Sequence, residues 1–276
     1  MKSIKEVLKN NSESGRATLV TFISCGDPEI SFTEKLVKAA CKGGADIIEL
    51  GVPFSDPMAD GATIQAASQR ALAAGTTLQK VLDMAGRLRK DGVENPFVLF
   101  SYYNPIFKLG LEKTAELSKK NGINAWLVVD VPLEESGEIS GVLKEYGIGL
   151  IPLAAPTSGL DRVRAISESG TDFLYYVTVA GVTGARNALP ESFSKRLADV
   201  RKASVLPVAA GFGISNPNMA HLAAESADAV VVGSKLVDLT FEEFLDNGES
   251  AALKAAENFV ASLAAAMKLS LIHISE

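Results

Sequence analysis

Histidine and cysteine are nearly absent from this 276-residue chain, which contains two of each. Cys25 and Cys41 are too few for a disulfide scaffold or a cysteine-rich metal site, and the low count indicates a reducing compartment. His221 falls inside a predicted helix and His273 among the last residues, so neither is expected at the end of a strand. We therefore expect no histidine catalysis and no metal site.

Long apolar runs and an excess of basic residues are also missing. No window approaches the roughly 20 apolar residues of a membrane span, and the charged N-terminal segment lacks the apolar core of a secretory signal. The 27 Lys and Arg residues against 33 Asp and Glu give a net charge of −6, without a basic stripe for nucleic acid. With 47% hydrophobic residues, the chain can bury a large core. We expect a soluble, cytoplasmic protein that binds neither membranes nor nucleic acid.

Nucleotide-binding loops and strand lysines are absent as well. The sequence has no GxxxxGK[ST] loop, and no GxGxxG follows the first predicted strand, so nothing supports nucleotide or dinucleotide binding. No predicted strand contains a lysine, which argues against a covalent amine mechanism. The groups left for chemistry at the strand ends are carboxylates, tyrosines and glycines.

Eight short runs of β-branched, aromatic and aliphatic residues, each followed by a helical pattern, organise the chain. They are nearly continuous apolar runs, which is typical of parallel strands covered by helices. The predicted strands are residues 18–24, 46–50, 97–102, 125–131, 148–153, 173–179, 205–210 and 229–232. Eight such units with right-handed crossovers close most economically into one (β/α)8 barrel, also called a TIM barrel, and this α/β fold is the one we predict.

Proline and glycine mark the expected helix boundaries. Asn216-Pro217 and Pro190 are predicted to begin helices. Three glycines are predicted to end them: Gly122, Gly147 and Gly170.

Two terminal segments lie outside the eight units. An extra helix over residues 4–9 is expected to cover the bottom of the barrel, and residues 250–268 are expected to form a final helix. The barrel domain is therefore predicted to span residues 1–268. The tail 269–276 (LSLIHISE) has no capping signals, and the sequence leaves open whether it is disordered or not native to the protein.

A carboxylate lies inside an apolar strand, at its carboxyl end. Glu49 follows Ile47 and Ile48, so burial would disfavour its charged form and raise its pKa toward neutrality, as a proton-transferring group requires. The alternative is a glutamate paired with a cation at the barrel rim, but no basic residue stands at the neighbouring strand ends. We predict that Glu49 is a general acid and base.

A second carboxylate, Asp60, lies in an enlarged loop after the second predicted strand. A helix is predicted to begin near Ala62, and an aspartate just before a helix is by default a cap, a reading that position alone slightly favours. Asp27 and Asp56, each followed by proline, are predicted to form turns.

Three glycine clusters follow the sixth, seventh and eighth predicted strands, at residues 181–184, 211–213 and 233–234. Glycine lets backbone N–H groups approach an anion, and Ser234 opens a predicted short helix whose positive end can face that anion. Any one cluster alone would indicate only a turn. Together they predict the phosphate site that recurs after strands 7 and 8 of this fold.

Inward-facing strand residues predict an aromatic and aliphatic slot at the barrel mouth, lined by Phe22, Phe100, Tyr102, Leu127 and Tyr175. For any single residue, packing in the barrel core is the better-supported alternative. As a set beside a phosphate site and two carboxylates, they indicate a flat apolar part of the substrate. Trp126 alternates to the other side and is assigned to the layer between strands and helices.

Six segments occur in the order and spacing of a known family: FISCGDPE, IIELGVPFSDPMADG, SYYNP, GVTGAR, PVAAGFGIS and VVVGS. By these segments the sequence resembles the tryptophan synthase alpha chain over nearly its whole length, to about Met267. The resemblance implies a lyase that cleaves indole-3-glycerol phosphate to indole and glyceraldehyde 3-phosphate, a step of tryptophan biosynthesis. It implies no cofactor in this chain, and a PLP-dependent beta chain as partner in an α2β2 heterotetramer.

The resemblance also implies roles for individual residues. Glu49 and Asp60 match the family's catalytic pair, and Thr183 matches the mobile loop that closes over Asp60. The family's phosphate ligands are matched by Gly184, Gly213, Gly233 and Ser234. Its indole and glycerol pocket is matched by Phe22, Phe100, Leu127, Tyr175 and Phe212. Segments similar to those that meet the beta chain contain Asp56, Pro57, Asn104 and Phe107. The family commonly has other residues at Cys25, Ala62 and Leu133.

Three other functions stay open at this point. One is a phosphosugar isomerase with Cys25 as general base, although its sixth predicted strand lacks the opposing acid. Another is a non-catalytic subunit that only activates a partner, against which Glu49 and Asp60 argue. A standalone lyase that releases indole has the same motifs.

Overall fold

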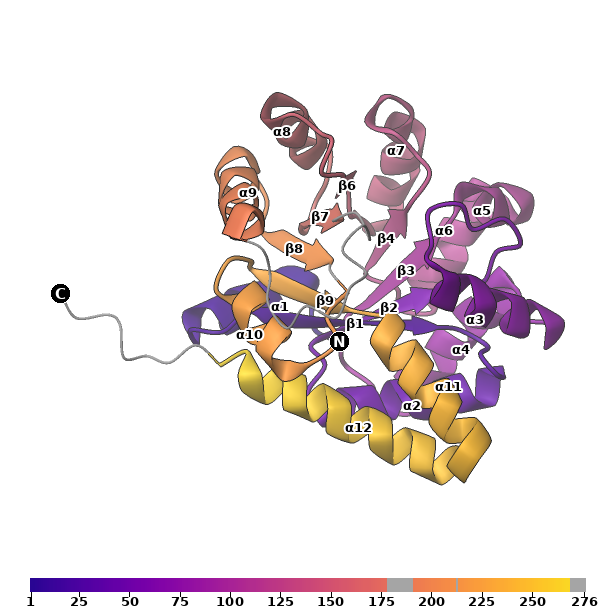
Figure 1. Ribbon diagram of the computed structural model, residues 1–276. Coiled ribbons are helices and arrows are strands. Elements are labelled where there is room, and N and C mark those ends of the chain that lie inside the picture. Colours follow the sequence, from indigo (N-terminus) through magenta and orange to yellow (C-terminus); the bar gives the residue numbers. More distant parts are fainter. Residues whose placement is uncertain (178–190, 212, 269–276) are drawn as a thin grey trace.

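Parallel strands form one curled sheet at the centre of the molecule (Figure 1). The computed structural model describes residues 1–177, 191–211 and 213–268. Within these residues the strands follow the order β5-β4-β3-β2-β1-β9-β8-β7-β6. Their bounds are β1 Thr18–Ser24, β2 Ile47–Gly51, β3 Phe97–Ser101, β4 Ala125–Val128, β5 Gly149–Leu150, β6 Leu153–Ala154, β7 Leu174–Val177, β8 Val208–Gly211 and β9 Ala229–Val232.

The barrel closes through the fifth predicted strand, which the structure divides into β5 and β6. β5 pairs with β4, and β6 pairs with β7. Between them, the Ile151 N–H donates to the Trp126 carbonyl at 2.8 Å, and the Pro152 carbonyl accepts from the Tyr175 N–H at 2.9 Å. Pro152 has no N–H to donate, so the ladder is interrupted there. β5 and β6 are two halves of one barrel strand, which confirms the predicted (β/α)8 fold.

Two predicted strands differ from the structure by three residues at one end, whereas those predicted at 46–50 and 97–102 differ by one residue, and the last residues of the strand predicted at 173–179 lie outside the described part. The strand predicted at 205–210 begins only at Val208, because Pro207 cannot donate to the ladder. The strand predicted at 125–131 ends at Val128, and the Asp130 carboxylate instead accepts from the Tyr103 N–H at 2.8 Å. The strands predicted at 18–24 and 229–232 are confirmed.

Helices surround the sheet on its outer face (Figure 1). Their bounds are α1 Ile4–Glu13, α2 Ile30–Gly43, α3 Ala62–Ala73, α4 Leu78–Lys90, α5 Tyr103–Leu109, α6 Leu111–Lys120, η1 Leu133–Glu135, α7 Ser136–Tyr146, α8 Leu160–Glu168, α9 Glu191–Ala203, α10 Pro217–Ala224, α11 Ser234–Asn247 and α12 Glu249–Ala266.

The first helix, α1, closes the amino-terminal end of the barrel. Its apolar residues Ile4, Val7 and Leu8 share one buried cluster with inward-facing strand residues such as Val20 and Val98. This confirms the predicted helix at the bottom of the barrel. The helix begins with a capping box, and it runs to residue 13 instead of residue 9.

Several predicted helix boundaries are also confirmed. The Asn216 side chain caps α10 by accepting from the Met219 N–H. Gly147 ends α7 with a left-handed φ of 64°, a conformation that favours glycine. Gly122 and Gly170 lie two residues after the ends of α6 and α8. The predicted helix start at Pro190 lies outside the described residues.

The last two helices differ in length from the prediction. The helix expected to be short after Ser234 is α11, which continues for 14 residues until Gly248 interrupts it with a φ of 83°. α12 ends at Ala266 and is followed by an antiparallel bridge between Lys268 and Arg16. The domain limit at residue 268 stays a prediction, since residues 269–276 lie outside the described part.

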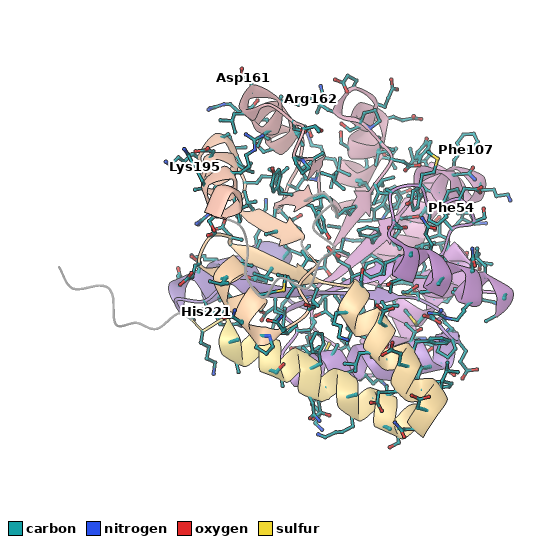
Figure 2. The ribbon with its side chains drawn as sticks, viewed as in Figure 1. Phe54, Phe107, Asp161, Arg162, Lys195 and His221 are labelled. Carbon is teal, nitrogen blue, oxygen red and sulfur yellow. The ribbon has the colours of Figure 1, made fainter. Side chains whose placement is uncertain are left out.

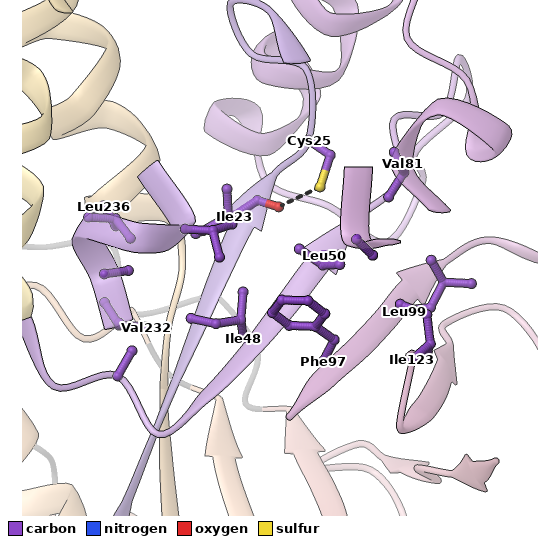
Figure 3. Packing of buried hydrophobic residues seen from close by; sticks show 14 of the residues in the cluster. Ile23, Cys25, Ile48, Leu50, Val81, Phe97, Leu99, Ile123, Val232 and Leu236 are labelled. Carbon is purple, nitrogen blue, oxygen red and sulfur yellow. Dashed lines mark hydrogen bonds between the residues drawn. The ribbon is translucent and has the colours of Figure 1, made fainter. Parts of the chain in front are cut away.

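Alternate residues of the strands face either the helices or the barrel interior. Ile48, Leu50 and Phe97 belong to the outer cluster between sheet and helices (Figure 3). Trp126 packs in the same layer, fully buried, and its Nε1–H donates to Ser118 Oγ of α6 at 3.0 Å. The placement of Trp126 is therefore confirmed. The other alternate residues of each strand line the barrel interior.

We expect Ser118→Ala to lower the free energy of unfolding by about 1–3 kcal/mol, because the buried indole N–H loses its acceptor. Urea denaturation followed by the fluorescence of Trp126, the one tryptophan of the chain, measures the effect. Ser140→Ala is the matched control, since Ser140 Oγ bonds only an exposed carbonyl of its own helix. Equal losses in the two variants would contradict this account.

Candidate active site

Glu49 is a carboxylic acid enclosed by the barrel wall. In the parallel register of β2 its partners are Phe22 of β1 and Val98 of β3. Its neighbours Ile48 and Leu50 face the outer helices, so Glu49 faces the interior. The residue is 0% exposed, and neither carboxyl oxygen has a hydrogen-bond partner among the described residues. The alternative of an ion pair at the rim is therefore wrong.

Burial raises the pKa of Glu49 from 4.5 to about 8, because the charged form loses its hydration and gains nothing in return. A carboxyl group with a pKa near neutrality can both donate and accept a proton at the pH of the cell. Its position, near the carboxyl end of a barrel strand, is where enzymes of this fold carry their reacting groups.

The side chain of Asp60 does not cap α3, although its position in the sequence slightly favours a capping role. The cap residue is Gly61, and the Asp60 carboxylate instead accepts a hydrogen bond from the Tyr102 hydroxyl at 3.1 Å. The same hydroxyl accepts from the Ala59 N–H at 2.9 Å, and the Tyr102 ring packs against Phe54 with centroids 4.9 Å apart. The Asp60 carboxylate thus has a donor that reaches it from the neighbouring strand.

Burial raises the pKa of Asp60, and the hydrogen bond from Tyr102 opposes that rise. Burial, followed by the charge of Asp60, raises the pKa of Tyr102, which therefore stays a neutral donor. This pairing is not among the predictions from sequence, which place Tyr102 only in the slot. The available signal was adjacency: Tyr102 follows β3, the sheet neighbour of β2, and parallel strands bring such ends together.

The rings of three predicted slot residues pack together in the barrel interior, and one of them, Phe22, is the strand partner of Glu49. The rings of Phe22 and Phe100 meet edge to face with centroids 5.0 Å apart, and Phe100 lies 6.5 Å from Tyr175. Burial raises the pKa of Tyr175, and the charges of Glu49 and Asp60 add to the rise. Leu127 is fully buried in the interior cluster on which Phe100 and Tyr175 pack.

Two glycines leave room for these rings. A Cβ at Gly51 would lie 2.4 Å from Phe22 Cζ, and one at Gly211 would lie 2.8 Å from Tyr175 Cε1. Neither distance is tolerable, so any larger residue would displace a slot ring.

The predicted phosphate residues are partly within the described structure. Gly233 immediately precedes α11, and a Cβ there would lie 3.3 Å from Phe22 Cβ, so the start of α11 stands beside the slot. Ser234 is the exposed first residue of that helix, and within the described residues no atom outside the adjoining chain lies within 4 Å of where a Cβ at Gly213 would stand. Three further predicted site residues lie outside the described part: Thr183, Gly184 and Phe212.

The structure removes the isomerase alternative. Cys25 is 0% exposed and lies in the outer cluster, where its thiol donates toward the Ile23 carbonyl at 3.7 Å (Figure 3). Burial raises the pKa of Cys25, so it forms no thiolate base. His221 lies on α10 near the molecular surface, with Nδ1 3.0 Å from the Ala266 carbonyl (Figure 2).

Among residues 1–177, 191–211 and 213–268, no group of three or more His, Cys, Asp or Glu side chains is arranged to hold a metal ion. In the same part of the chain, no helix combines the length and apolar character that crossing a membrane requires.

The closed parallel barrel, with acidic and aromatic side chains gathered at the carboxyl ends of its strands, defines a (β/α)8-barrel enzyme. Residues 8–268 match the family model described as "Tryptophan synthase alpha chain". The chain belongs to this family.

Curated relatives and solved structures agree with the family match. The tryptophan synthase alpha chain of Geobacter sp. strain M21 is 48% identical over 244 residues, which are 88% of this chain and 91% of the relative. That of Geobacter sulfurreducens is 50% identical over 237 residues, 86% and 88% of the two chains. The crystal structure of the alpha chain from Legionella pneumophila superposes with a TM-score of 0.89, at 32% identity and 97% coverage of each chain.

We expect Glu49→Gln to gain stability over the wild type as pH rises. The folded protein holds the Glu49 proton up to about pH 8, whereas the unfolded chain releases it near 4.5. Raising the pH between these values therefore favours unfolding of the wild type, by roughly 1 kcal/mol per pH unit relative to the variant. Urea denaturation across this pH window tests it, with the exposed Glu116→Gln as control. A difference independent of pH would show that Glu49 ionises freely in the fold.

Proposed function

We propose that Glu49 and Asp60 perform the chemistry of this lyase, with the aromatic slot and the start of α11 holding the two ends of the substrate. As a tryptophan synthase alpha chain, the enzyme cleaves indole-3-glycerol phosphate to indole and glyceraldehyde 3-phosphate. The observation that carries the assignment of residues is the fully buried carboxyl group of Glu49, which has no hydrogen-bond partner among the residues that the structure describes.

Cleavage of this substrate is a retro-aldol reaction that must turn the indole ring into a leaving group. Three events are needed: a proton must reach C3 of the ring, positive charge developing toward N1 must be stabilised, and the side-chain hydroxyl must lose its proton. When the bond from C3 to the side chain breaks, its electron pair stays with the ring and the hydroxyl carbon becomes the aldehyde.

Glu49 can serve both proton transfers in turn. Below its raised pKa of about 8 the carboxyl group is protonated and can donate to C3. The carboxylate that results can accept the hydroxyl proton as the bond breaks, which returns Glu49 to its starting state. No water-exposed base is required, because the same group gives and recovers the proton.

Asp60 can stabilise the positive charge that develops on the indole ring. A carboxylate that accepts the N1–H hydrogen bond stabilises the cation formed when C3 is protonated. The Tyr102 hydroxyl donates to one Asp60 oxygen, Oδ2, and favours its ionised form, which leaves Oδ1 for the substrate. Tyr102 is in this proposal the residue that orients Asp60.

The remaining assignments concern substrate binding. The flat indole fits between Phe22, Phe100 and Tyr175, above Leu127. The phosphate fits the amino end of α11, where free N–H groups and the helix dipole favour an anion. Gly213, Gly233 and Ser234 would supply backbone contacts there, together with Gly184. Phe212 is proposed to complete the pocket, and Thr183 the loop that closes over Asp60.

The chemistry proposed for this chain needs no cofactor, because each step uses a side chain. PLP is assigned to a beta chain, with which this chain would form an α2β2 heterotetramer. Large apolar side chains support a docking face: Met58 is 93% exposed, and Phe107, labelled in Figure 2, is 69% exposed. A groove of about 360 Å³ is lined by the loop that contains Phe54 and by α5, the helix that carries Phe107. Cytoplasmic localisation stays a prediction.

Indole release from indole-3-glycerol phosphate tests the catalytic pair. We expect Glu49→Gln to lose at least about 100-fold in kcat, since an amide can neither donate nor accept the transferred proton. Asp60→Asn should lose about 10- to 100-fold, because the amide oxygen still accepts the N1–H bond but carries no charge. Both variants should still stimulate a beta chain.

Two results would overturn these roles. Full activity of Asp60→Asn would remove it from the mechanism. Wild-type protein that releases no indole even with a beta chain would favour the activating subunit over the enzyme. Activity of the wild type without a beta chain, equal to that of the complex, would favour the standalone lyase.

Phe107→Ser tests the docking face. Exposed aromatic residues are the usual anchors of an interface, so we expect about a tenfold loss of affinity for the beta chain, with unchanged indole release by the isolated chain. Val205→Ser is the control, because Val205 is 53% exposed but precedes β8 at the opposite end of the barrel. Titration calorimetry with the beta chain measures both. Equal affinities would place the partner elsewhere.

A further inference from the structure

Two helices that begin at the two ends of the proposed substrate site are fastened to each other. α3 begins at Ala62, two residues after Asp60, and α11 begins at Ser234. Ile64 and Ala67 of α3 pack with Val237 of α11 in one small buried cluster, which also includes Phe22 of the slot. The contact therefore lies directly behind the aromatic slot.

A polar contact joins the two helices near their starts. Thr63 Oγ1 donates to Asp238 Oδ2 at 3.1 Å, and these are the second residue of α3 and the fifth residue of α11. This bond holds the residues next to Asp60 at a fixed place relative to the phosphate end. On its own it is half-exposed and weak.

Arg70 makes the stronger connection, farther along α3. Its Nε and Nη2 donate to the two carboxylate oxygens of Asp27, each at 2.7 Å. Its guanidinium carbon lies 3.5 Å above the ring centroid of Phe241 on α11. One side chain thus joins the loop after β1, the helix after the Asp60 loop and the helix of the phosphate end. A bidentate, stacked guanidinium fixes orientation as well as distance.

The Asp27 carboxylate depends on this contact. Its side chain is 5% exposed, and both of its oxygens are bound by Arg70. Burial raises the pKa of Asp27, and the Arg70 hydrogen bonds oppose that rise. Loss of the guanidinium would leave a buried carboxylate unpaired and free the three segments from one another.

We infer that Arg70 is a positioning residue for the cleavage reaction. It keeps α3 and α11 in register, so that the Asp60 carboxylate and the phosphate-binding start of α11 stand at the separation that one bound substrate requires. The inference rests on the function proposed above. It assigns to Arg70 no contact with the substrate, and its effect should appear only when both ends of one molecule are held at once.

Kinetics with substrate fragments distinguish this role from simple support of the fold. For Arg70→Met we expect kcat/KM for indole-3-glycerol phosphate to fall about 10- to 100-fold, because fixed geometry is what makes two-ended binding effective. The inhibition constants of indole alone and of glycerol 3-phosphate alone should stay within about twofold, since each half-site remains intact. Arg70→Lys keeps the positive charge but cannot form the two parallel hydrogen bonds to Asp27, so it should recover only part of the lost kcat/KM. Gln69→Met, at the exposed neighbour on the same helix, is the control.

Milder variants keep the test valid if Arg70→Met does not fold. Phe241→Leu removes the ring under the guanidinium, and Thr63→Val removes the hydroxyl with little change of shape. Each should lower kcat/KM by about threefold with unchanged fragment affinities.

Three outcomes separate the hypotheses. Folded variants that keep kcat/KM within twofold of the wild type would overturn the inference, whatever their melting temperature. Loss of affinity for glycerol 3-phosphate alone would also overturn it, because Arg70 would then shape the phosphate site itself. Full activity of Asp60→Asn would instead reject the proposed function, independently of any result at Arg70.

Discussion

The desolvated carboxyl group of Glu49 is the constraint on which the rest of the site depends. An acid without a partner inside a barrel is unfavourable when ionised, and this cost is what gives it a pKa of about 8. The surrounding features fit that state: the rings of Phe22 and Phe100 pack together beside it, and no described side chain forms a hydrogen bond with its oxygens. The buried carboxyl group lowers the stability of the fold, but it also provides a group that can transfer protons at neutral pH.

The two carboxylates of the site differ because their surroundings differ. Glu49 has no hydrogen-bond donor within the described residues, whereas Asp60 has the Tyr102 hydroxyl, which favours the charged form. One strand and the loop that follows it thus supply a carboxyl group held neutral and a carboxyl group whose ionised form is supported by a hydrogen bond. A single mechanism can use the first for proton transfer and the second for charge stabilisation.

Much of this arrangement was accessible from the sequence, and the reasons are physical. Continuous apolar runs at regular intervals identified the barrel, because only buried parallel strands need them. The burial of Glu49 followed from its position in such a run. The Tyr102 bond to Asp60 could have been expected from the adjacency of their strands, but the Arg70 fork on Asp27 and the full length of α11 could not, because they depend on packing between residues far apart in the chain. The interruption at Pro152 was equally hidden, since periodicity does not report which ladder bonds are made.

That interruption has a consequence for how the wall is built. The first half of the chain ends its share of the sheet at β5, bonded only to β4, and the second half resumes at β6, bonded only to β7. Opposite β1 and β9, the wall is therefore completed by one divided strand, whose first half pairs with β4 and whose second half pairs with β7. The protein can be regarded as two half-barrels, each with its own share of the substrate cradle, joined on one side by the ladder between β1 and β9 and on the other by this shared strand.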